Sequence, residues 1–246
     1  MSHAKHNCNA HWATLKLVTV ISGITLASYA TPGVAQTYDI SKAPSRRMNV
    51  EEVFNQGVNK TEVGNFQAAI KDFDRVLQIN PTFIEAYCNR GIARAGLENY
   101  QGAMADFNSA LRLNPNHADA YNKRGTTLAQ MGNFKDAIAE FNTALRLDTS
   151  FVDAYYNRGL AQSELGNPTE AIANYNQAIQ LNPNLAEAYG NRGFMRYHLG
   201  EKPQAIADLQ KAAQIFLAQN NAASYQQTLA YIQMMRSPTA KPATLP

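Results

Sequence analysis

The sequence has few of the side chains from which catalytic and metal centres are built. Its 246 residues include five histidines and two cysteines, and beyond residue 35 only His117, His198 and Cys88 remain. No His-x-x-x-His, Cys-x-x-Cys or glycine-rich phosphate loop is present. A serine or cysteine nucleophile also needs a histidine that a third group holds in place. We therefore expect no catalytic activity, no cofactor and no metal site.

Neither sign of charge dominates the chain. It has 22 Lys and Arg residues against 19 Asp and Glu residues, and Lys5 and Lys16 are the only full charges among the first 35 residues. The remainder therefore carries 20 basic against 19 acidic residues. This balance argues against a nucleic acid or an anionic membrane as a partner held by bulk charge. The single cysteine left beyond residue 35 excludes an internal disulfide framework.

The N-terminal stretch lacks an apolar run long enough to span a membrane. Leu17–Ala30 is mostly apolar and carries no charge, but it is shorter than the ~20 residues that a spanning helix needs. It precedes the small residues Gly33, Val34 and Ala35, a layout typical of a secretory signal peptide. We therefore expect cleavage near Ala35, a periplasmic or secreted mature protein, and a linker over residues 36–49. The alternative is an uncleaved N-terminal anchor, which would be the only contact with a membrane.

From residue 50 onward the sequence repeats with a period of 34 residues. The five units occupy residues 50–83, 84–117, 118–151, 152–185 and 186–217. Position 8 of every unit is glycine: Gly57, Gly91, Gly125, Gly159 and Gly193. Position 20 is alanine: Ala69, Ala103, Ala137, Ala171 and Ala205. Position 24 is aromatic in four units, with Leu209 in the fifth, and position 32 is proline in three: Pro81, Pro115 and Pro183.

This pattern resembles the tetratricopeptide repeat (TPR) family across residues 50–217, because that family has a period of 34 residues and wants small residues at positions 8 and 20 and a large one at 24. The resemblance implies an all-α superhelix, a TPR solenoid of five helix-turn-helix repeats. Helix A would cover positions 1–14 and helix B positions 17–30. In the fourth unit, Gly159 would face Ala171 where the two helices cross, with Tyr175 beside the crossing.

Residues that favour helix ends and helix caps occur at the predicted helix boundaries. Gly166 favours the end of a helix A, and Asn167 followed by Pro168 favours the start of a helix B. Capping-box patterns predict the start of four helices A: Thr82-x-x-Glu85, Asn116-x-x-Asp119, Ser150-x-x-Asp153 and Asn184-x-x-Glu187.

The chain after the fifth repeat carries one further helical pattern. Residues 218–236 hold an apolar stripe made of Tyr225, Leu229, Ile232 and Met235, which predicts a helix that caps the open end of the solenoid. The alternative is an amphipathic helix that binds a partner. Residues 237–246 contain three prolines and no periodicity, which is typical of a disordered tail.

The resemblance also implies which residues face the inner, concave surface, namely positions 2, 5, 6, 9, 12 and 13 of helix A. Position 6 forms a column of four asparagines and one lysine: Asn55, Asn89, Lys123, Asn157 and Asn191. An asparagine offers donors and an acceptor to an extended peptide backbone, as in the asparagine ladders of long peptide-binding TPR superhelices. Apolar residues flank the column: Phe54, Ile92, Tyr156, Leu160 and Phe194. The alternative is that Asn-Arg-Gly is merely habitual in this repeat subtype.

Two charged columns accompany the asparagines. Position 2 is acidic in all five units, which favours complementarity to the helix dipole over a negative stripe for a basic peptide. Position 7 is arginine in four units, and we expect ion pairs with position 23 of the preceding helix B. The expected pairs are Arg90–Asp72, Arg124–Asp106, Arg158–Glu140 and, more weakly, Arg192–Asn174.

Taken with the resemblance, these residues predict a non-enzymatic scaffold or assembly factor that binds a protein or peptide in its concave groove. No lysine pairs occupy the positions of the two-carboxylate clamp found in chaperone-tail-binding TPR domains, so a C-terminal carboxylate is not the expected ligand. One alternative is a structural solenoid that associates with itself through its ends. A more distant alternative is an unrecognised enzyme that acts on the cell wall.

Overall fold

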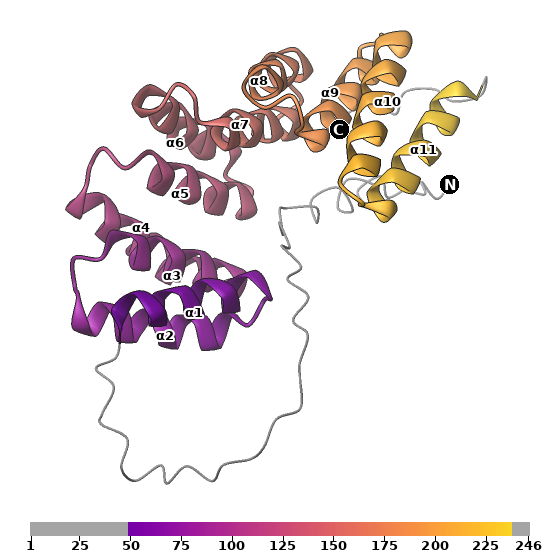
Figure 1. Cartoon of the computed structure of the whole chain (residues 1–246). Coiled ribbons are helices and arrows are strands. Elements are labelled where there is room, and N and C mark those ends of the chain that lie inside the picture. The colour runs from indigo at the N-terminus through magenta and orange to yellow at the C-terminus, as the bar shows by residue number, and fades with distance from the viewer. Residues whose placement is uncertain (1–48, 238–246) are drawn as a thin grey trace, which may run out of the picture. The chain divides into compact units, whose positions relative to one another are not determined.

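The computed structural model describes residues 49–237 of the chain. Over these residues it contains eleven α-helices and no β-strand (Figure 1). The predicted signal peptide, the linker up to residue 48 and the tail after residue 237 lie outside this part. The predicted all-α fold is confirmed.

Ten helices form five pairs in the register that the repeat predicts. The pairs are α1 (Val50–Glu62) with α2 (Phe66–Ile79), α3 (Ile84–Gly96) with α4 (Tyr100–Leu113), α5 (Ala118–Gln130) with α6 (Phe134–Leu147), α7 (Val152–Glu164) with α8 (Pro168–Leu181), and α9 (Ala186–His198) with α10 (Lys202–Ala218). The helices A end one residue earlier than predicted. The last helix, α11 (Ala222–Arg236), follows the fifth pair.

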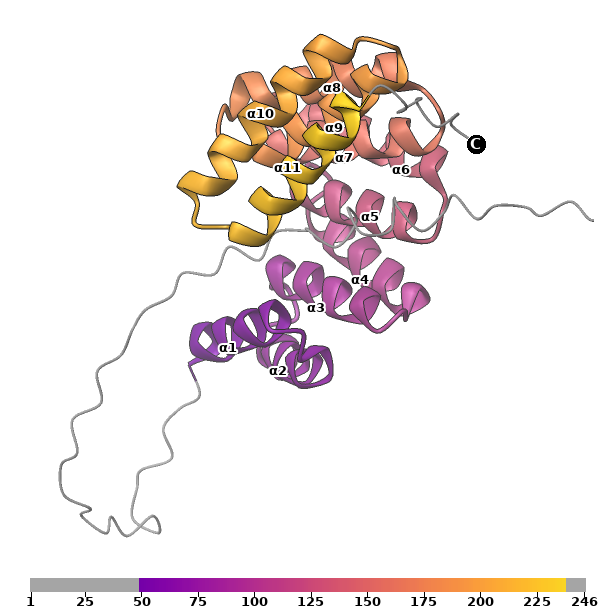
Figure 2. The ribbon, with the colours of Figure 1, turned by 90° about the vertical axis from the view of Figure 1, so that its right-hand side faces the viewer.

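Helices A and B differ in what they contact. Each helix packs against its neighbours in sequence, and successive helices A also contact one another. Within residues 49–237 no two successive helices B do so to a comparable extent. Helices A therefore line the inner, concave side of the stack, and helices B cover the outer side. Figure 2 shows the order of the pairs along the stack.

The helices of a pair cross where the glycine at position 8 lies beneath the ring at position 24. A Cβ built on Gly159 would stand 2.6 Å from the ring of Tyr175, and the equivalent distance is 2.7 Å in the first three repeats. The sequence predicts that Gly159 faces Ala171. In the structure the atoms nearest to the added Cβ belong instead to the ring of Tyr175. In the fifth pair Leu209 replaces the ring, and Gly193 instead approaches the backbone oxygen of Ala205. All five alanines at position 20 are fully buried.

The helices A begin where predicted, but not with the predicted capping boxes. Their N-cap residues are one place later: Phe83, His117, Phe151 and Leu185. The residues predicted as caps instead donate their backbone N–H groups to an Asn or Asp side chain two residues earlier, at 2.9–3.1 Å. These Asx turns bracket Pro81, Pro115, Thr149 and Pro183. Of the four N-cap residues only His117 makes a side-chain cap bond, accepting from the Ala120 N–H at 3.2 Å. Asn167 also accepts no cap bond, and its Nδ2 donates to Gln162 Oε1 at 2.8 Å.

The turn from helix A to helix B requires a left-handed residue at position 15. Glycine supplies it in four repeats, with φ between 73° and 81°. In the second repeat Glu98 occupies the same position with φ 60°. A side chain in this region costs energy that glycine avoids.

The C-terminal helix completes the stack, which confirms the predicted capping helix. Tyr225 and Tyr189 both pack against the cluster formed by Ala186, Ala212, Ile215 and Phe216, so α11 takes the place of a sixth helix A. Ile232 and Met235 are buried. The predicted apolar stripe of α11 therefore packs within the protein rather than on a partner.

Candidate functional site

Three asparagines at position 6 of helices A donate an amide N–H group to an acceptor within the protein. Asn89 Nδ2 donates to the backbone oxygen of Glu85 at 2.8 Å. Asn157 Nδ2 donates to Oδ1 of Asn122 at 3.1 Å and to Oγ1 of Thr126 at 3.3 Å. The last two acceptors belong to the preceding repeat, so Asn157 also joins neighbouring repeats.

The asparagine of the fifth repeat bonds the preceding repeat as Asn157 does. Asn191 Nδ2 donates to the hydroxyl oxygen of Tyr156 in the fourth repeat at 3.1 Å. No side-chain nitrogen or oxygen atom in residues 49–237 is both buried and without a hydrogen bond. The Oδ1 atoms of Asn89, Asn157 and Asn191, which accept no bond there, must therefore face solvent. The column thus presents hydrogen-bond acceptors along the concave face.

The two other members of the predicted column behave differently. Asn55 in the first repeat is exposed. Lys123 forms an ion pair with Asp119 one turn earlier in its own helix. The lysine therefore interrupts the row of amides and neutralises part of the acidic column beside it.

The apolar residues predicted to flank the column are largely engaged within the protein. Phe54 packs on Phe83 with ring centroids 5.0 Å apart. Phe194 is only 9% exposed, because the ring of Tyr231 from α11 meets it edge-on at 4.8 Å. Phe194 consequently has little surface left for a ligand.

The remaining apolar flank is partly open. Ile92 packs against the core around Phe107, and Tyr156 packs on Tyr175 with centroids 6.0 Å apart. Leu160 is half-buried. Because these side chains are partly buried, a ligand on the concave face would meet mainly the polar columns and the exposed parts of these apolar residues.

The acidic column lies in the first turns of helices A, beside the asparagines. Burial raises the pKa of Asp153, Asp119 in the neighbouring repeat raises it further, and Lys123 opposes the shift. Burial also raises the pKa of Glu187. A place in the first turn of a helix would by itself stabilise the charged form. The upward shifts at Asp153 and Glu187 run against that effect, so these two residues are not explained by the helix dipole alone.

The arginine column pairs differently from the sequence prediction. Arg90 Nη2 lies 2.7 Å from Asp106 Oδ1, and Arg90 Nη1 lies 2.6 Å from Asp74 Oδ1. Each arginine thus reaches position 23 of its own helix B and position 25 of the preceding one. The predicted pairs Arg90–Asp72, Arg124–Asp106, Arg158–Glu140 and Arg192–Asn174 are wrong, because position 23 faces the helix A of its own repeat. Each arginine also lies 5.3–5.5 Å from the ring centroid of the tyrosine at position 4.

Models of known families match four overlapping segments of this helix stack. Models described as tetratricopeptide repeat match residues 60–121, 107–139 and 152–185, and one described as TPR repeat matches residues 125–166. The chain belongs to the TPR family. No curated protein sequence matches it significantly.

Solved structures of TPR proteins share the fold. MamA has a TM-score of 0.57 and 25% identity, over 67% of this chain and 96% of its own. TTC0263, a TPR protein of Thermus thermophilus, has a TM-score of 0.63 and 19% identity, over 76% of this chain and 98% of its own. YrrB, described as a TPR protein with an unusual peptide-binding site, has a TM-score of 0.52 and 21% identity, over 75% and 94% respectively.

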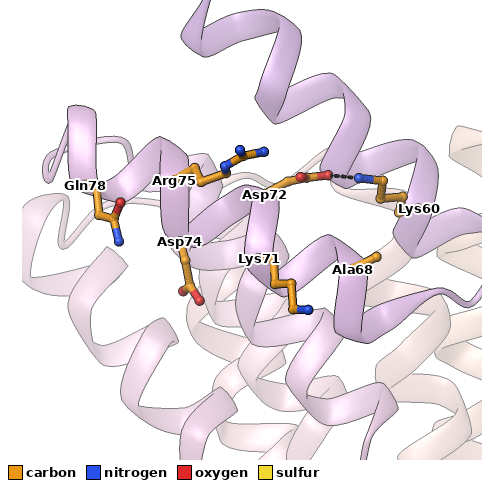
Figure 3. A pocket seen from close by; sticks show the side chains of 7 residues that line it. All are labelled: Lys60, Ala68, Lys71, Asp72, Asp74, Arg75 and Gln78. Atoms are coloured by element: carbon orange, nitrogen blue, oxygen red, sulfur yellow. Dashed lines mark hydrogen bonds and ion pairs between the residues drawn. The ribbon is translucent and has the colours of Figure 1, made fainter. Parts of the chain in front are cut away.

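An open hollow of about 510 Å³ lies beside α2 in the first TPR repeat. The lining residues, drawn in Figure 3, are Lys60, Ala68, Lys71, Asp72, Asp74, Arg75 and Gln78. Lys60 forms an ion pair with Asp72, and Asp74 is paired with Arg90. Gln56 stands where later repeats have arginine, so Asp72 depends on Lys60. The lining of the hollow therefore offers charged and amide side chains but no nucleophile with a base.

Cys88, the one cysteine of the TPR region, is a core residue. It is 1% exposed, and burial raises the pKa of its thiol to about 12, so the thiol stays protonated at neutral pH. Within the part that the structure describes, no three His, Cys, Asp or Glu side chains are grouped so that they could hold a metal ion. None of the helices there has both the length and the apolar character needed to cross a bilayer.

Proposed function

We propose that this TPR protein is a non-enzymatic scaffold or assembly factor that holds an extended segment of a partner protein along its concave face. The observation that carries the proposal is the hydrogen bonding of Asn89, Asn157 and Asn191. Each amide N–H group bonds within the protein, to its own helix in Asn89 and to the preceding repeat in the other two, and within residues 49–237 none of the three Oδ1 atoms accepts a bond. Packed helices lie about 8–10 Å apart. Three residues of an extended chain, at about 3.3 Å each, span that distance. A bound segment with about three residues per repeat can therefore run along the column, past the amides of the second, fourth and fifth repeats and past Lys123 in the third.

The chemistry of the concave face favours a partner rich in hydrogen-bond donors. Backbone N–H groups would meet the asparagine oxygens, and Lys or Arg side chains would meet the carboxylates at position 2. A cationic segment would also relieve the repulsion between Asp119 and Asp153, which raises the pKa of Asp153 in the free protein. The proposed ligand is thus a basic, extended segment. The description of YrrB as a TPR protein with a peptide-binding site supports this use of the fold.

The ends of the stack argue against the alternative of self-association by stacking. On α1 the positions that pack on a preceding repeat elsewhere carry the exposed polar residues Glu52, Gln56 and Asn59. On α11 the corresponding outward positions include the exposed Gln226 and Gln233. Hydrated polar ends gain little from stacking on another copy, since the hydrophobic contribution scales with apolar area removed from water.

Binding of defined peptides tests the proposal. Three fluorescent peptides of equal length, one rich in Lys, one neutral and one rich in Glu, would be titrated with residues 36–246 by fluorescence anisotropy. We expect the Lys-rich peptide to bind most tightly and to weaken with added salt. Asn89→Ala combined with Asn157→Ala should reduce its affinity about tenfold, the equivalent of about 1.4 kcal/mol.

A matched control variant carries Asn108→Ala and Asn176→Ala. These two asparagines are exposed, lie on helices B, and each accept one hydrogen bond from an arginine. The control should bind as the unchanged protein does. Equal binding by both double variants, or equal affinity for all three peptides, would refute the concave site.

We also propose that the protein acts outside the cytoplasm after removal of residues 1–35. The apolar stretch and the small residues before Gln36 support this localisation. N-terminal sequencing of the protein from fractionated cells tests it. An exported chain that begins near Gln36 is expected, whereas a chain retained in the cytoplasm with its first residues intact would contradict the proposal.

A further inference from the structure

The arginine column contains one member without a carboxylate partner. Arg90, Arg124 and Arg192 bind carboxylate oxygens of Asp106, Glu140 and Asp208 through their Nη2 atoms, at 2.7, 2.8 and 2.6 Å. In the fourth repeat the equivalent position of helix B is Asn174, and the neighbouring position on the preceding helix B is Asn142. The four repeats therefore allow a direct comparison of the same arginine with and without a carboxylate partner.

Arg158 is held in the same place as the other arginines. Its Nε donates to Asn174 Oδ1 and its Nη1 donates to Asn142 Oδ1, each at 2.6 Å. Its guanidinium carbon lies 5.4 Å from the ring centroid of Tyr155. The side chain is therefore fixed in the orientation in which its neighbours receive a carboxylate.

The Nη2 atom of Arg158 is the donor left open. No hydrogen bond to it occurs within residues 49–237, and no side-chain nitrogen in that range is both buried and unpaired. The atom consequently faces solvent. It lies between α6 and α8, which belong to the outer side of the stack.

The pKa shifts of Arg90 and Arg158 have opposite directions. Burial lowers the pKa of Arg90, but the hydrogen bonds and charges of Asp106 and Asp74 more than offset it, so the net shift is upward. Burial also lowers the pKa of Arg158, and only Tyr155 opposes that shift. Arg158 thus carries a half-buried positive charge that no carboxylate of the described chain compensates.

We propose that Arg158, held between Asn142 of α6 and Asn174 of α8, binds an aspartate or glutamate side chain of a partner protein. The carboxylate would accept from Nη2 alone, because Asn174 already occupies the place beside Nε from which Glu140 and Asp208 bind both Nε and Nη2 in the adjacent repeats. Charge-assisted bonds of this kind are stronger than neutral ones, and the arginine is already ordered for them. This surface is separate from the concave face, so the inference does not depend on the proposed peptide groove.

A titration with sodium acetate tests the site, since acetate is the smallest carboxylate that carries a methyl group in place of a side chain. The Nε–Hε signals of the arginines would be followed by NMR at constant ionic strength, with acetate replacing chloride. We expect a saturable shift of the Arg158 signal, while the signals of Arg124 and Arg192 stay in place. A drift without saturation that is equal for all arginines would overturn the proposal.

Two variants sharpen the result. Asn174→Asp places a carboxylate where the other repeats have one, so the Arg158 signal should begin at a shifted position and no longer respond to acetate. The matched control Asn176→Asp adds the same charge beside Arg192, which already has Asp208, and the response of Arg158 should remain. An unchanged acetate response in Asn174→Asp would refute the site. Acetate binding should also raise the Tm of the unchanged protein. This rise should be lost in Arg158→Lys, which removes the planar fork but keeps the charge.

Discussion

The ring of Tyr175 lies directly over Gly159, and a Cβ added to this glycine would stand 2.6 Å from Cε1 of the ring. Tyr175 is 1% exposed and also packs on Tyr156, so the ring has little room to move away. The glycine at position 8 is therefore required by packing. The same relationship recurs in the first three repeats with phenylalanine as the ring.

We expect Gly159→Ala to destabilise the protein by about 1–3 kcal/mol through overpacking. This loss should exceed the roughly 1 kcal/mol by which alanine is preferred over glycine inside a helix. Gly190→Ala is the control, because nothing lies within 4 Å of the Cβ that it adds. Gly190→Ala should stabilise by about 0.5–1 kcal/mol. Urea unfolding of both variants measures the difference, and equal effects would contradict the packing argument.

Glu98 is in the left-handed conformation that four other repeats give to glycine. We expect Glu98→Gly to stabilise the second repeat by about 1 kcal/mol, because the strain of a side chain with positive φ is removed. Gly132→Ala, at the same position of the third repeat, should destabilise by a similar amount. A lower Tm for Glu98→Gly than for the unchanged chain would show that the Glu98 side chain contributes more than its backbone costs.

Asn174→Asp should restore the ion pair that the fourth repeat lacks. Partly buried, bidentate pairs of this kind stabilise by about 1 kcal/mol. The pairing would lower the pKa of the new carboxyl, so the gain should be full above its ordinary pKa of about 4 and fade as the pH falls through the lowered value. Thermal unfolding at pH 7 and pH 3 checks this. A gain that persists at pH 3 would contradict an ionic origin.

Asp153→Asn should raise the stability of the free protein at pH 7. Burial and Asp119 raise the pKa of Asp153 when the chain is folded, so its charged form opposes folding. The penalty should disappear as the pH falls through the raised pKa, and the two proteins should converge below about pH 4.

Asp148 provides the opposite case for the same series of thermal melts. Hydrogen bonds from the side chain and backbone of Ser150 lower the pKa of Asp148. Its charge therefore supports folding above its ordinary pKa of about 4, and this support fades at lower pH. Asp148→Asn should consequently lose stability at pH 7. Identical pH profiles for Asp153→Asn and Asp148→Asn would disprove both assignments.

The arginine column illustrates where the sequence alone is insufficient. A period of 34 residues places an acidic or amide residue at position 23 in every repeat, so Arg124 could equally face Asp106 or Glu140. The structure selects Glu140, because helix A of a repeat lies against position 23 of its own helix B. Only the packing of three helices around each arginine distinguishes these two partners.

The 34-residue period by itself determined the helices, their order and the small-against-large contacts within each pair, because those contacts are local and recur in every repeat. It also placed Asn89, Asn157 and Asn191 in one column. The tertiary structure decided which atoms of these asparagines face outward, that Tyr231 covers Phe194, and that Arg158 lacks a carboxylate. These features depend on contacts between different helices and repeats, and a periodic sequence does not specify which copy of a residue meets which.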